Sequence, residues 1–178
     1  MTRDGIFQIT ATALLIAIGI LIPMYSPLRL VIPPAASYTL ASHAAIFVAM
    51  FISPKVAIAV TIGTTFGFLL GGFPIVVVMR AASHLVFVIP GAIYLAKAKR
   101  ASLHGIKLRI FSVVMALIHA FAEAVTVLFF YMGTYFPEGQ GVWWVLGFIG
   151  AGTVAHSLID FEIANVIRRA LMKAKLMT

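Results

Sequence analysis

The positions of the basic residues relative to the apolar segments are the strongest constraint on how this chain folds. Eleven of the 13 Lys and Arg residues fall in segments that a six-pass arrangement places on one side of a membrane: Arg3, Lys55, Lys97, Lys99, Arg100, Lys107, Arg109, Arg168, Arg169, Lys173 and Lys175. Of the other two, Arg29 lies in a loop on the opposite side and Arg80 lies inside an apolar segment. Because cytoplasmic segments of membrane proteins are enriched in Lys and Arg, the pattern predicts an integral membrane protein with cytoplasmic N- and C-termini.

The composition favours the same class. Of the 178 residues, 62% are hydrophobic and 10% are charged, whereas soluble domains have about 25% charged residues. The net charge of +8 does not indicate a nucleic acid partner, because the basic residues lie at the ends of apolar segments. Anionic lipid headgroups or a cytoplasmic partner account for it better. The absence of cysteine excludes disulfides and thiolate metal sites.

Six apolar segments predict an all-α protein with six transmembrane helices in a single domain, residues 1–178. They cover residues 6–22, 39–52, 56–70, 75–96, 110–136 and the stretch from 142 into the basic tail. The first is expected to be a retained helix, since no small-residue cleavage site precedes Pro23. Residues 23–38 contain four prolines and are expected to form a long outer loop. The second and third segments are short for crossing a membrane, and a re-entrant pair is the alternative for them.

Arg80 and His84 are a polar pair inside segment 75–96, and their spacing of four residues places them on one helical face. An Arg within a membrane helix usually faces a polar interior, so one interpretation is that Arg80 binds an anionic or strongly accepting group of a ligand. Snorkelling toward the interface and a structural ion pair with Glu123 are the alternatives.

His119 and Glu123 form a second pair with the same spacing, in segment 110–136. A lone ionised Glu in hydrocarbon is costly, so Glu123 requires a partner or a proton. It is either part of an interhelical or His119 contact, or a ligand-binding carboxylate in an outward-facing cavity. His and Glu at this spacing without a third close ligand are weak evidence for a metal ion, and no metal or other cofactor is predicted.

His156 and Asp160 form a third pair, in the last segment. This pair is expected to be structural, because basic residues near the inner end can reach the acidic group: Arg168, Arg169 or Lys175. His43 either lines a cavity or marks the membrane interface. Small residues four apart predict close helix packing in lipid, and they occur as Ala13 and Ala17, as Gly63, Gly67 and Gly71, and as Gly147 and Ala151.

Several motifs of known chemistry are missing. The chain has no P-loop, so it is not expected to hydrolyse ATP itself. It contains neither a GxSxG nor an HExxH motif, and no enzyme activity is predicted.

The chain resembles the substrate-binding S-components of energy-coupling factor (ECF) vitamin transporters over essentially its whole length. Size, six predicted helices, basic inner ends and the long loop after the first helix carry the resemblance. Ala13 and Ala17 are similar to the small-residue motif with which S-components dock on their transmembrane coupling subunit. Residues 39–84, TLASHAAIFVAMFISPKVAIAVTIGTTFGFLLGGFPIVVVMRAASH, resemble a subgroup with assignments such as niacin, pantothenate or hydroxymethylpyrimidine uptake.

The resemblance implies a high-affinity capture subunit in the bacterial plasma membrane. Such a subunit binds a vitamin from outside in a pocket between the fourth, fifth and sixth helices, with the outer loop as a lid. It then joins a coupling subunit and two cytoplasmic ATPases, and topples to release the vitamin inside. The expected substrate-binding residues are Arg80, His84, His119, Glu123 and His43, with Tyr131 and Trp143 for aromatic stacking and Tyr25, Arg29 and Tyr38 from the loop.

The ligand stays open at this level. An Arg80 that binds ligand favours a carboxylate, as in niacin or pantothenate, whereas an Arg80 neutralised by Glu123 suits a neutral pyrimidine or a pyridine such as pyridoxine. The main alternative function is a small proton-coupled carrier or channel that works alone, with the His119/Glu123 and His156/Asp160 pairs as a relay. A non-transporting assembly subunit is a further alternative.

Overall fold

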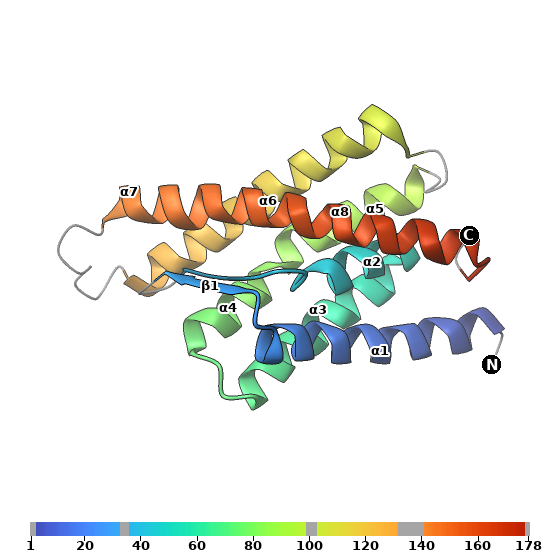
Figure 1. Ribbon diagram of the computed structural model, residues 1–178, viewed down its shortest axis with the longest axis horizontal. Coiled ribbons are helices and arrows are strands. Elements are labelled where there is room, and N and C mark those ends of the chain that lie inside the picture. Colours follow the sequence, from blue (N-terminus) through green and yellow to red (C-terminus); the bar gives the residue numbers. More distant parts are fainter. Residues whose placement is uncertain (1–2, 33–35, 99–102, 132–140, 177–178) are drawn as a thin grey trace.

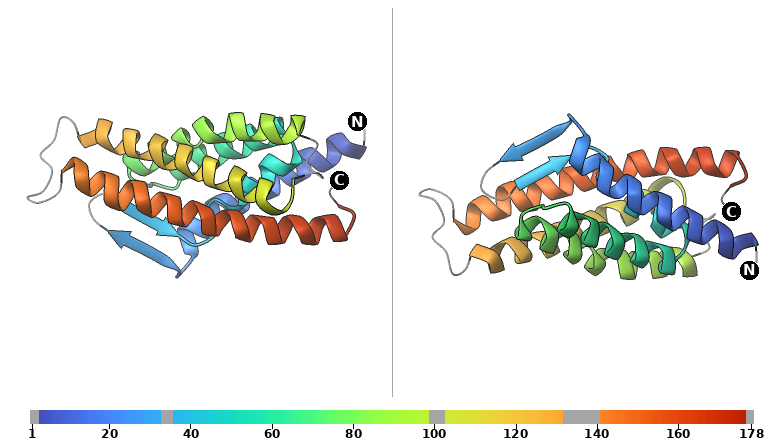
Figure 2. Two further views of the ribbon diagram at one scale, coloured as in Figure 1. Left: turned by 90° about the horizontal axis from the view of Figure 1, so that it is seen from above. Right: turned by 90° about the horizontal axis from the view of Figure 1, so that it is seen from below.

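A bundle of helices, elongated along the helix axes, makes up most of the molecule (Figures 1 and 2). The computed structural model describes residues 3–32, 36–98, 103–131 and 141–176. The two ends of the chain lie at the same end of the bundle, and a short hairpin lies nearer the other end (Figure 1). This arrangement agrees with the prediction that both termini lie on the same side of the membrane. That this side is the cytoplasmic one stays a prediction.

The described residues contain four stretches long and apolar enough to cross a membrane. They are Asp4–Tyr25, Ile75–Lys97, Gly105–Phe130 and Val142–Lys173. The first lies in α1 (Arg3–Tyr25), and the second holds α4 (Ile75–Ser83) and α5 (Leu85–Lys97). The third lies in α6 (Gly105–Tyr131), and the fourth joins α7 (Val142–Trp144), the π-helix η2 (Val145–Ala151) and α8 (Gly152–Lys173). The prediction of a helical membrane protein is confirmed.

The second and third predicted segments form a short pair, α2 (Ala44–Ile52) and α3 (Pro54–Leu70). Ser53 separates them, and its hydroxyl oxygen accepts a hydrogen bond from the Val56 amide at 3.1 Å. With Pro54 in the first turn, this is a standard start for a helix. All nine residues of α2 are buried, so α2 lies in the middle of the bundle. At nine residues it spans about 13 Å, less than a bilayer, and six full crossings remain a prediction.

Several expected boundaries differ from the structure. The first helix, expected over residues 6–22, extends over α1 from Arg3 to Tyr25 with Pro23 inside it, so the outer loop begins after Tyr25. The outer loop contains an antiparallel hairpin of β1 (Arg29–Ile32) and β2 (Ala36–Thr39), with Arg29 opposite Thr39. Thr39 therefore ends a strand, and the helix expected from residue 39 begins at Ala44. The helix expected over 75–96 is broken at His84. The helix expected from 110 begins one and a half turns earlier, at Gly105, and residues 132–136 of that prediction lie outside the described part.

The small residues of α3 allow α1 to pack closely against it. A side chain at Gly63 would meet Ile16, and one at Gly67 would meet Ile20, so the predicted close packing is confirmed at these two positions. The prediction is wrong at Gly147, where an added Cβ would have nothing within 4 Å. The face of η2 that carries Gly147 is exposed and packs against no described helix there.

Candidate functional site

A cavity of about 270 Å³ lies between the hairpin and helices α2, α3 and α4. Its lining is mostly apolar with a few polar groups: Pro23, Arg29, Val31, Ser37, Thr39, Ser42, His43, Ile46, Thr61, Thr64, Phe68, Phe73, Pro74, Val76, Val77, Arg80, Ala81, His84 and Glu123. Among the described residues, α6 contributes only Glu123 and η2 and α8 contribute none. The cavity thus lies beside α4 on the side of α2 and α3, and not between the last three predicted helices.

Arg80 and Glu123 form a buried ion pair at the wall of this cavity. The Arg80 Nη2 donates to Glu123 Oε2 at 2.8 Å, and both side chains are almost fully buried. Two charges this deep in an apolar bundle are tolerated because each neutralises the other. Of the interpretations left open by the sequence, the ion pair with Glu123 is present. Snorkelling is excluded because the Arg80 side chain is only 6% exposed.

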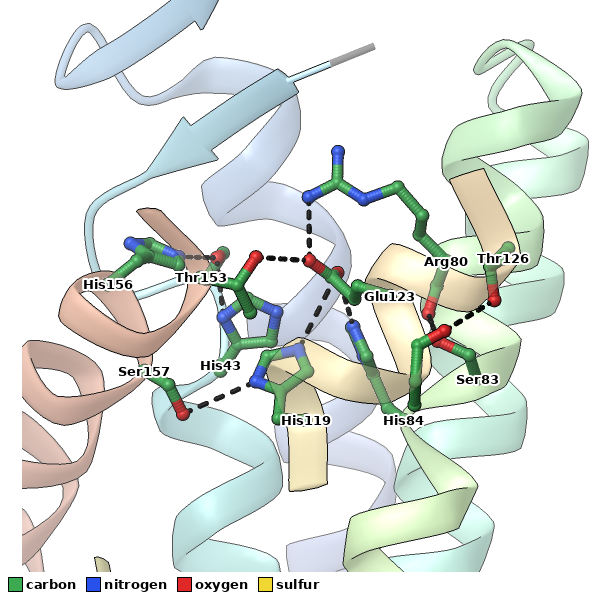
Figure 3. A network of polar contacts seen from close by, with 12 residues as sticks. His43, Arg80, Ser83, His84, His119, Glu123, Thr126, Thr153, His156 and Ser157 are labelled. Atoms are coloured by element: carbon green, nitrogen blue, oxygen red, sulfur yellow. Dashed lines mark hydrogen bonds and ion pairs between the residues drawn. The ribbon is translucent and has the colours of Figure 1, made fainter. Parts of the chain in front are cut away.

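Glu123 has further partners around both of its oxygens (Figure 3). Thr153 Oγ1 on α8 donates to Oε2 at 2.7 Å. The other oxygen, Oε1, lies 3.2 Å from His84 Nε2 and 3.5 Å from His119 Nε2. The predicted residues Arg80, His84, His119 and Glu123 therefore meet at one carboxylate, with three helices contributing to it.

Asp160 is the centre of a second cluster, and its partners differ from those expected. Its carboxylate accepts the backbone N–H of Ala41 at 2.7 Å and of His43 at 2.8 Å, and it lies 3.1 Å from His43 Nδ1. His156 Nε2 lies 3.3 Å from the same carboxylate. The turn it binds includes Ala41 at a positive φ of 67°, a conformation that L residues adopt only when the surroundings hold it.

The prediction that Asp160 contacts the basic tail is therefore wrong. Arg168 instead donates to Asn165 at 3.3 Å and lies 4.7 Å above the centre of the Phe51 ring. Asp160 lies two turns above Arg168 on α8 and faces the start of α2. Among the described residues its contacts hold the turn before α2 and include no Lys or Arg of the tail.

Tyr38 joins the hairpin to the π-helix. Its hydroxyl donates to the backbone carbonyl of Phe148, and the carbonyl of Ile149 lies 3.4 Å away. Burial raises the pKa of the Tyr38 phenol, so the group keeps its proton and acts as a donor. A side chain at Gly152 would collide with this ring. Tyr38 does not line the cavity, although its neighbours Ser37 and Thr39 do.

The remaining predicted residues lie in different places. Arg29 lines the cavity. Tyr25 is 74% exposed and Trp143 is 85% exposed, and neither lines the cavity. Tyr131 ends α6, and its side chain lies outside the described part of the structure. In α1, the docking candidates Ala13 and Ala17 are both exposed.

Most residues of the cavity wall were not predicted from the sequence, and among them are Thr61, Thr64, Phe68 and Phe73. The two threonines are buried in α3, and the two phenylalanine rings stack on each other with centres 4.6 Å apart. Thr61 donates to the Ala57 carbonyl within its helix, whereas Thr64 Oγ1 has no hydrogen-bond partner among the described residues. The signal that was available is the spacing of three between polar residues in an otherwise apolar helix.

Comparison with known proteins places the chain in a family. It is 38% identical over 166 residues to the niacin transporter NiaX of Lactococcus lactis subsp. cremoris (strain MG1363), a match that covers 91% of this chain and 73% of that protein. No protein-family model and no solved structure matches the chain. With the apolar helices, this relationship identifies a multi-pass protein of the bacterial plasma membrane. The chain belongs to the family of substrate-binding S-components of ECF vitamin transporters, to which its sequence pointed.

Proposed function

We propose that this chain captures niacin, in its carboxylate form, from outside the cell and delivers it to an ATP-driven ECF uptake complex. The observation that carries the proposal is a buried arginine, Arg80, in the wall of a small cavity in a relative of a niacin transporter. ATP hydrolysis is assigned to two separate partner ATPases, and the chain itself is not an enzyme.

Arg80 has the chemistry to bind a carboxylate while it remains paired with Glu123. A guanidinium carries five N–H donors in a planar fork, and its Nη2 donates to Glu123. Figure 3 shows the other terminal nitrogen pointing away from Glu123. A ligand carboxylate in the cavity that approaches this guanidinium would receive charge-assisted hydrogen bonds.

The size and lining of the cavity favour a single-ring ligand. Its volume of about 270 Å³ is at the small end of the usual range for ligand pockets, about 300–1,000 Å³. The Phe68 and Phe73 rings and the surrounding aliphatic groups offer an apolar surface to an aromatic ring. The Thr64 hydroxyl, without a partner among the described residues, offers a hydrogen bond to a ring nitrogen.

Binding of nicotinate and nicotinamide to the purified chain in detergent tests the proposal directly. The two compounds have nearly the same shape and differ in charge, so a site built around Arg80 should bind nicotinate at least 100-fold more tightly, about 2.7 kcal/mol. Pantothenate, pyridoxine and hydroxymethylpyrimidine complete the panel. Equal affinity for the acid and the amide, or tight binding of another member, would overturn niacin as the ligand. Uptake by liposomes that contain this chain alone would instead support the carrier alternative.

Docking on the coupling subunit is proposed for the face of α1 that carries Ala13 and Ala17. Both side chains are exposed, whereas Ile16 and Ile20 pack against the glycines of α3. Small exposed residues allow a partner helix to approach closely in lipid. An Ala17→Phe change should prevent copurification of the coupling subunit and leave nicotinate binding intact. Ala155→Phe, at an equally exposed alanine of α8, is the matched control and should copurify normally.

A further inference from the structure

Four of the five histidines of this chain meet in one buried cluster with two carboxylates. They are His43 from the start of α2, His84 from the α4–α5 break, His119 from α6 and His156 from α8. The ring centres of His43, His84 and His119 are each 4.7 Å from the other two. Histidine is a poor filler of an apolar core because its ring nitrogens require partners, so this concentration calls for a chemical explanation.

The spacing of the atoms around Glu123 matches that of ligands around a metal ion. Its Oε1 is 3.2 Å from His84 Nε2 and 3.5 Å from His119 Nε2. Tetrahedral ligands at bond lengths of about 2.0–2.1 Å lie about 3.3–3.4 Å from one another. With His43, these residues place four ligand atoms within 4.8 Å of each other. His43 adds a nitrogen donor to those of His84 and His119. The sequence spacing of His119 and Glu123 gives no sign of this additional ligand.

The outer nitrogens of two of these rings are held as in metal sites. His43 Nδ1 is 3.1 Å from Asp160 Oδ2, which leaves Nε2 directed toward Glu123 (Figure 3). His119 Nδ1 is 3.3 Å from Ser157 Oγ, which leaves its Nε2 on the side of Glu123. Metal-binding histidines almost always make such a hydrogen bond with the second ring nitrogen, to a carboxylate, carbonyl or water, because it fixes the ring and increases its basicity.

We propose that His43, His84, His119 and Glu123 bind one divalent transition-metal ion, with Zn²⁺ as the best match to three imidazoles and one carboxylate. Nitrogen-rich tetrahedral sites of this kind suit zinc and its neighbours cobalt and nickel rather than magnesium or calcium. Asp160 and Ser157 are positioning residues that orient His43 and His119. Binding of the ion does not depend on which vitamin the chain carries.

The site would place the ion at the wall of the vitamin cavity. His43, His84 and Glu123 line that cavity, whereas His119 is fully buried behind them. A divalent ion beside Arg80, Glu123 and Asp160 leaves the cluster with one excess positive charge when the histidines are neutral. A carboxylate ligand would neutralise it, so metal and vitamin should increase each other's affinity.

Metal binding by the full-length chain tests the proposal without any vitamin. The protein is purified in detergent with a tag that contains no histidine, treated with a chelator and dialysed, and then titrated with Zn²⁺ by calorimetry and with Co²⁺ by visible absorption. We expect one Zn²⁺ per chain, micromolar or tighter, and a Co²⁺ spectrum of tetrahedral intensity. Substoichiometric binding, or a Co²⁺ spectrum of octahedral intensity, would overturn the proposal.

Variants identify the ligands. His119→Gln should weaken Zn²⁺ binding at least 100-fold, whereas His104→Gln, at the exposed histidine outside the cluster, should leave it unchanged. If His119→Gln fails to fold, His84→Gln serves in its place. Loss of affinity in the His104 variant alone would assign the ion to the surface and contradict the proposal.

Ser157→Ala separates a positioning role from a merely structural one. It should weaken Zn²⁺ binding about tenfold and shift the Co²⁺ absorption bands, without a change in stoichiometry. Measuring nicotinate affinity with and without the chelator then distinguishes the two proposals. Zn²⁺ binding without nicotinate binding would support the metal site and contradict niacin as the ligand. Nicotinate binding that a chelator does not affect, in a chain that binds no Zn²⁺, would support niacin and contradict the metal site.

Discussion

Two His–carboxylate pairs with the same spacing of four residues have different surroundings in this protein. Glu123 of α6 lines the cavity, and its partners are the side chains of Arg80, His84, His119 and Thr153. Asp160 of α8 does not line the cavity, and two of its partners are backbone amides of the turn before α2. The motif is the same, yet one carboxylate gathers side chains from several helices and the other fastens the chain.

The difference shows what decides the role of a buried carboxylate. Backbone amides cannot leave without unfolding the turn, so a carboxylate that binds them contributes mainly to stability. Side-chain partners can rearrange when a ligand arrives, because rotamer changes cost little compared with backbone changes. Asp160 is therefore expected to control folding, and the Glu123 cluster is expected to control binding.

The largest effect on stability is expected from Asp160→Asn. The change removes the negative charge that accepts two backbone N–H groups and faces His43, and it should lower the free energy of unfolding by about 3 kcal/mol. Thermal melting in detergent measures it. Glu162→Gln, at an exposed acidic residue two positions along α8, should melt like the wild type. Equal melting of the two variants would remove the distinction between the clusters.

Arg80→Lys tests the other side of the comparison. Lysine keeps the positive charge beside Glu123 but lacks the planar fork, so we expect melting to change little and nicotinate affinity to fall about 30-fold, ~2 kcal/mol. Calorimetry measures the affinity, and Arg109→Lys at an exposed position of α6 is the control. Full retention of affinity would mean that Arg80 serves Glu123 alone.

Tyr38→Phe should have a moderate effect that is confined to stability. It removes the hydroxyl that donates to the π-helix, which should cost about 1 kcal/mol of unfolding free energy. Nicotinate affinity should stay within threefold, because Tyr38 does not line the cavity. Tyr94→Phe is the control, since Tyr94 is half exposed and does not line the cavity. A large loss of affinity in Tyr38→Phe would show that the hairpin attachment belongs to the binding region.

Thr64→Val should have the smallest effect of the four changes. In contrast to Tyr38→Phe, it should alter nicotinate affinity and leave stability unchanged. The hydroxyl of Thr64 has no partner among the described residues, so its removal should not destabilise the fold. If it serves the ligand, nicotinate affinity should fall about fivefold, ~1 kcal/mol. Thr65→Val, at a neighbouring threonine that does not line the cavity, should bind nicotinate normally. An unchanged affinity in Thr64→Val would remove Thr64 from the site.

The apolar segments located the helices, because lipid permits few alternatives to them. They did not reveal the hairpin, since strands of four residues next to prolines carry little pattern. Nor did they reveal the helix break at His84, where no Pro or Gly interrupts the local sequence. In the structure the Ser83 hydroxyl donates to the Arg80 carbonyl just before the break, a contact that can bend a helix but that the sequence alone does not announce.

The spacing of polar residues within the helices predicted each His–carboxylate pair but not how the pairs meet. His43 and Asp160 are 117 residues apart, and no local periodicity carries that information. The same holds for the cavity, whose wall combines residues of the hairpin with residues of α2, α3 and α4. Their residues look like ordinary lipid-facing or loop residues until the helices are packed.

The close packing of α1 against α3 has a consequence for how a docked partner and a bound vitamin affect each other. Gly19 of α1 lies directly against Thr64 of the cavity wall, while Ala13 and Ala17 are exposed on the same helix. A single helix thus separates the proposed partner surface from the proposed vitamin. Linkage requires that the factor by which a docked partner changes vitamin affinity equals the factor by which the vitamin changes partner affinity. A single coupling factor, obtained either from vitamin binding or from partner binding, would then describe how the two binding events across α1 affect each other.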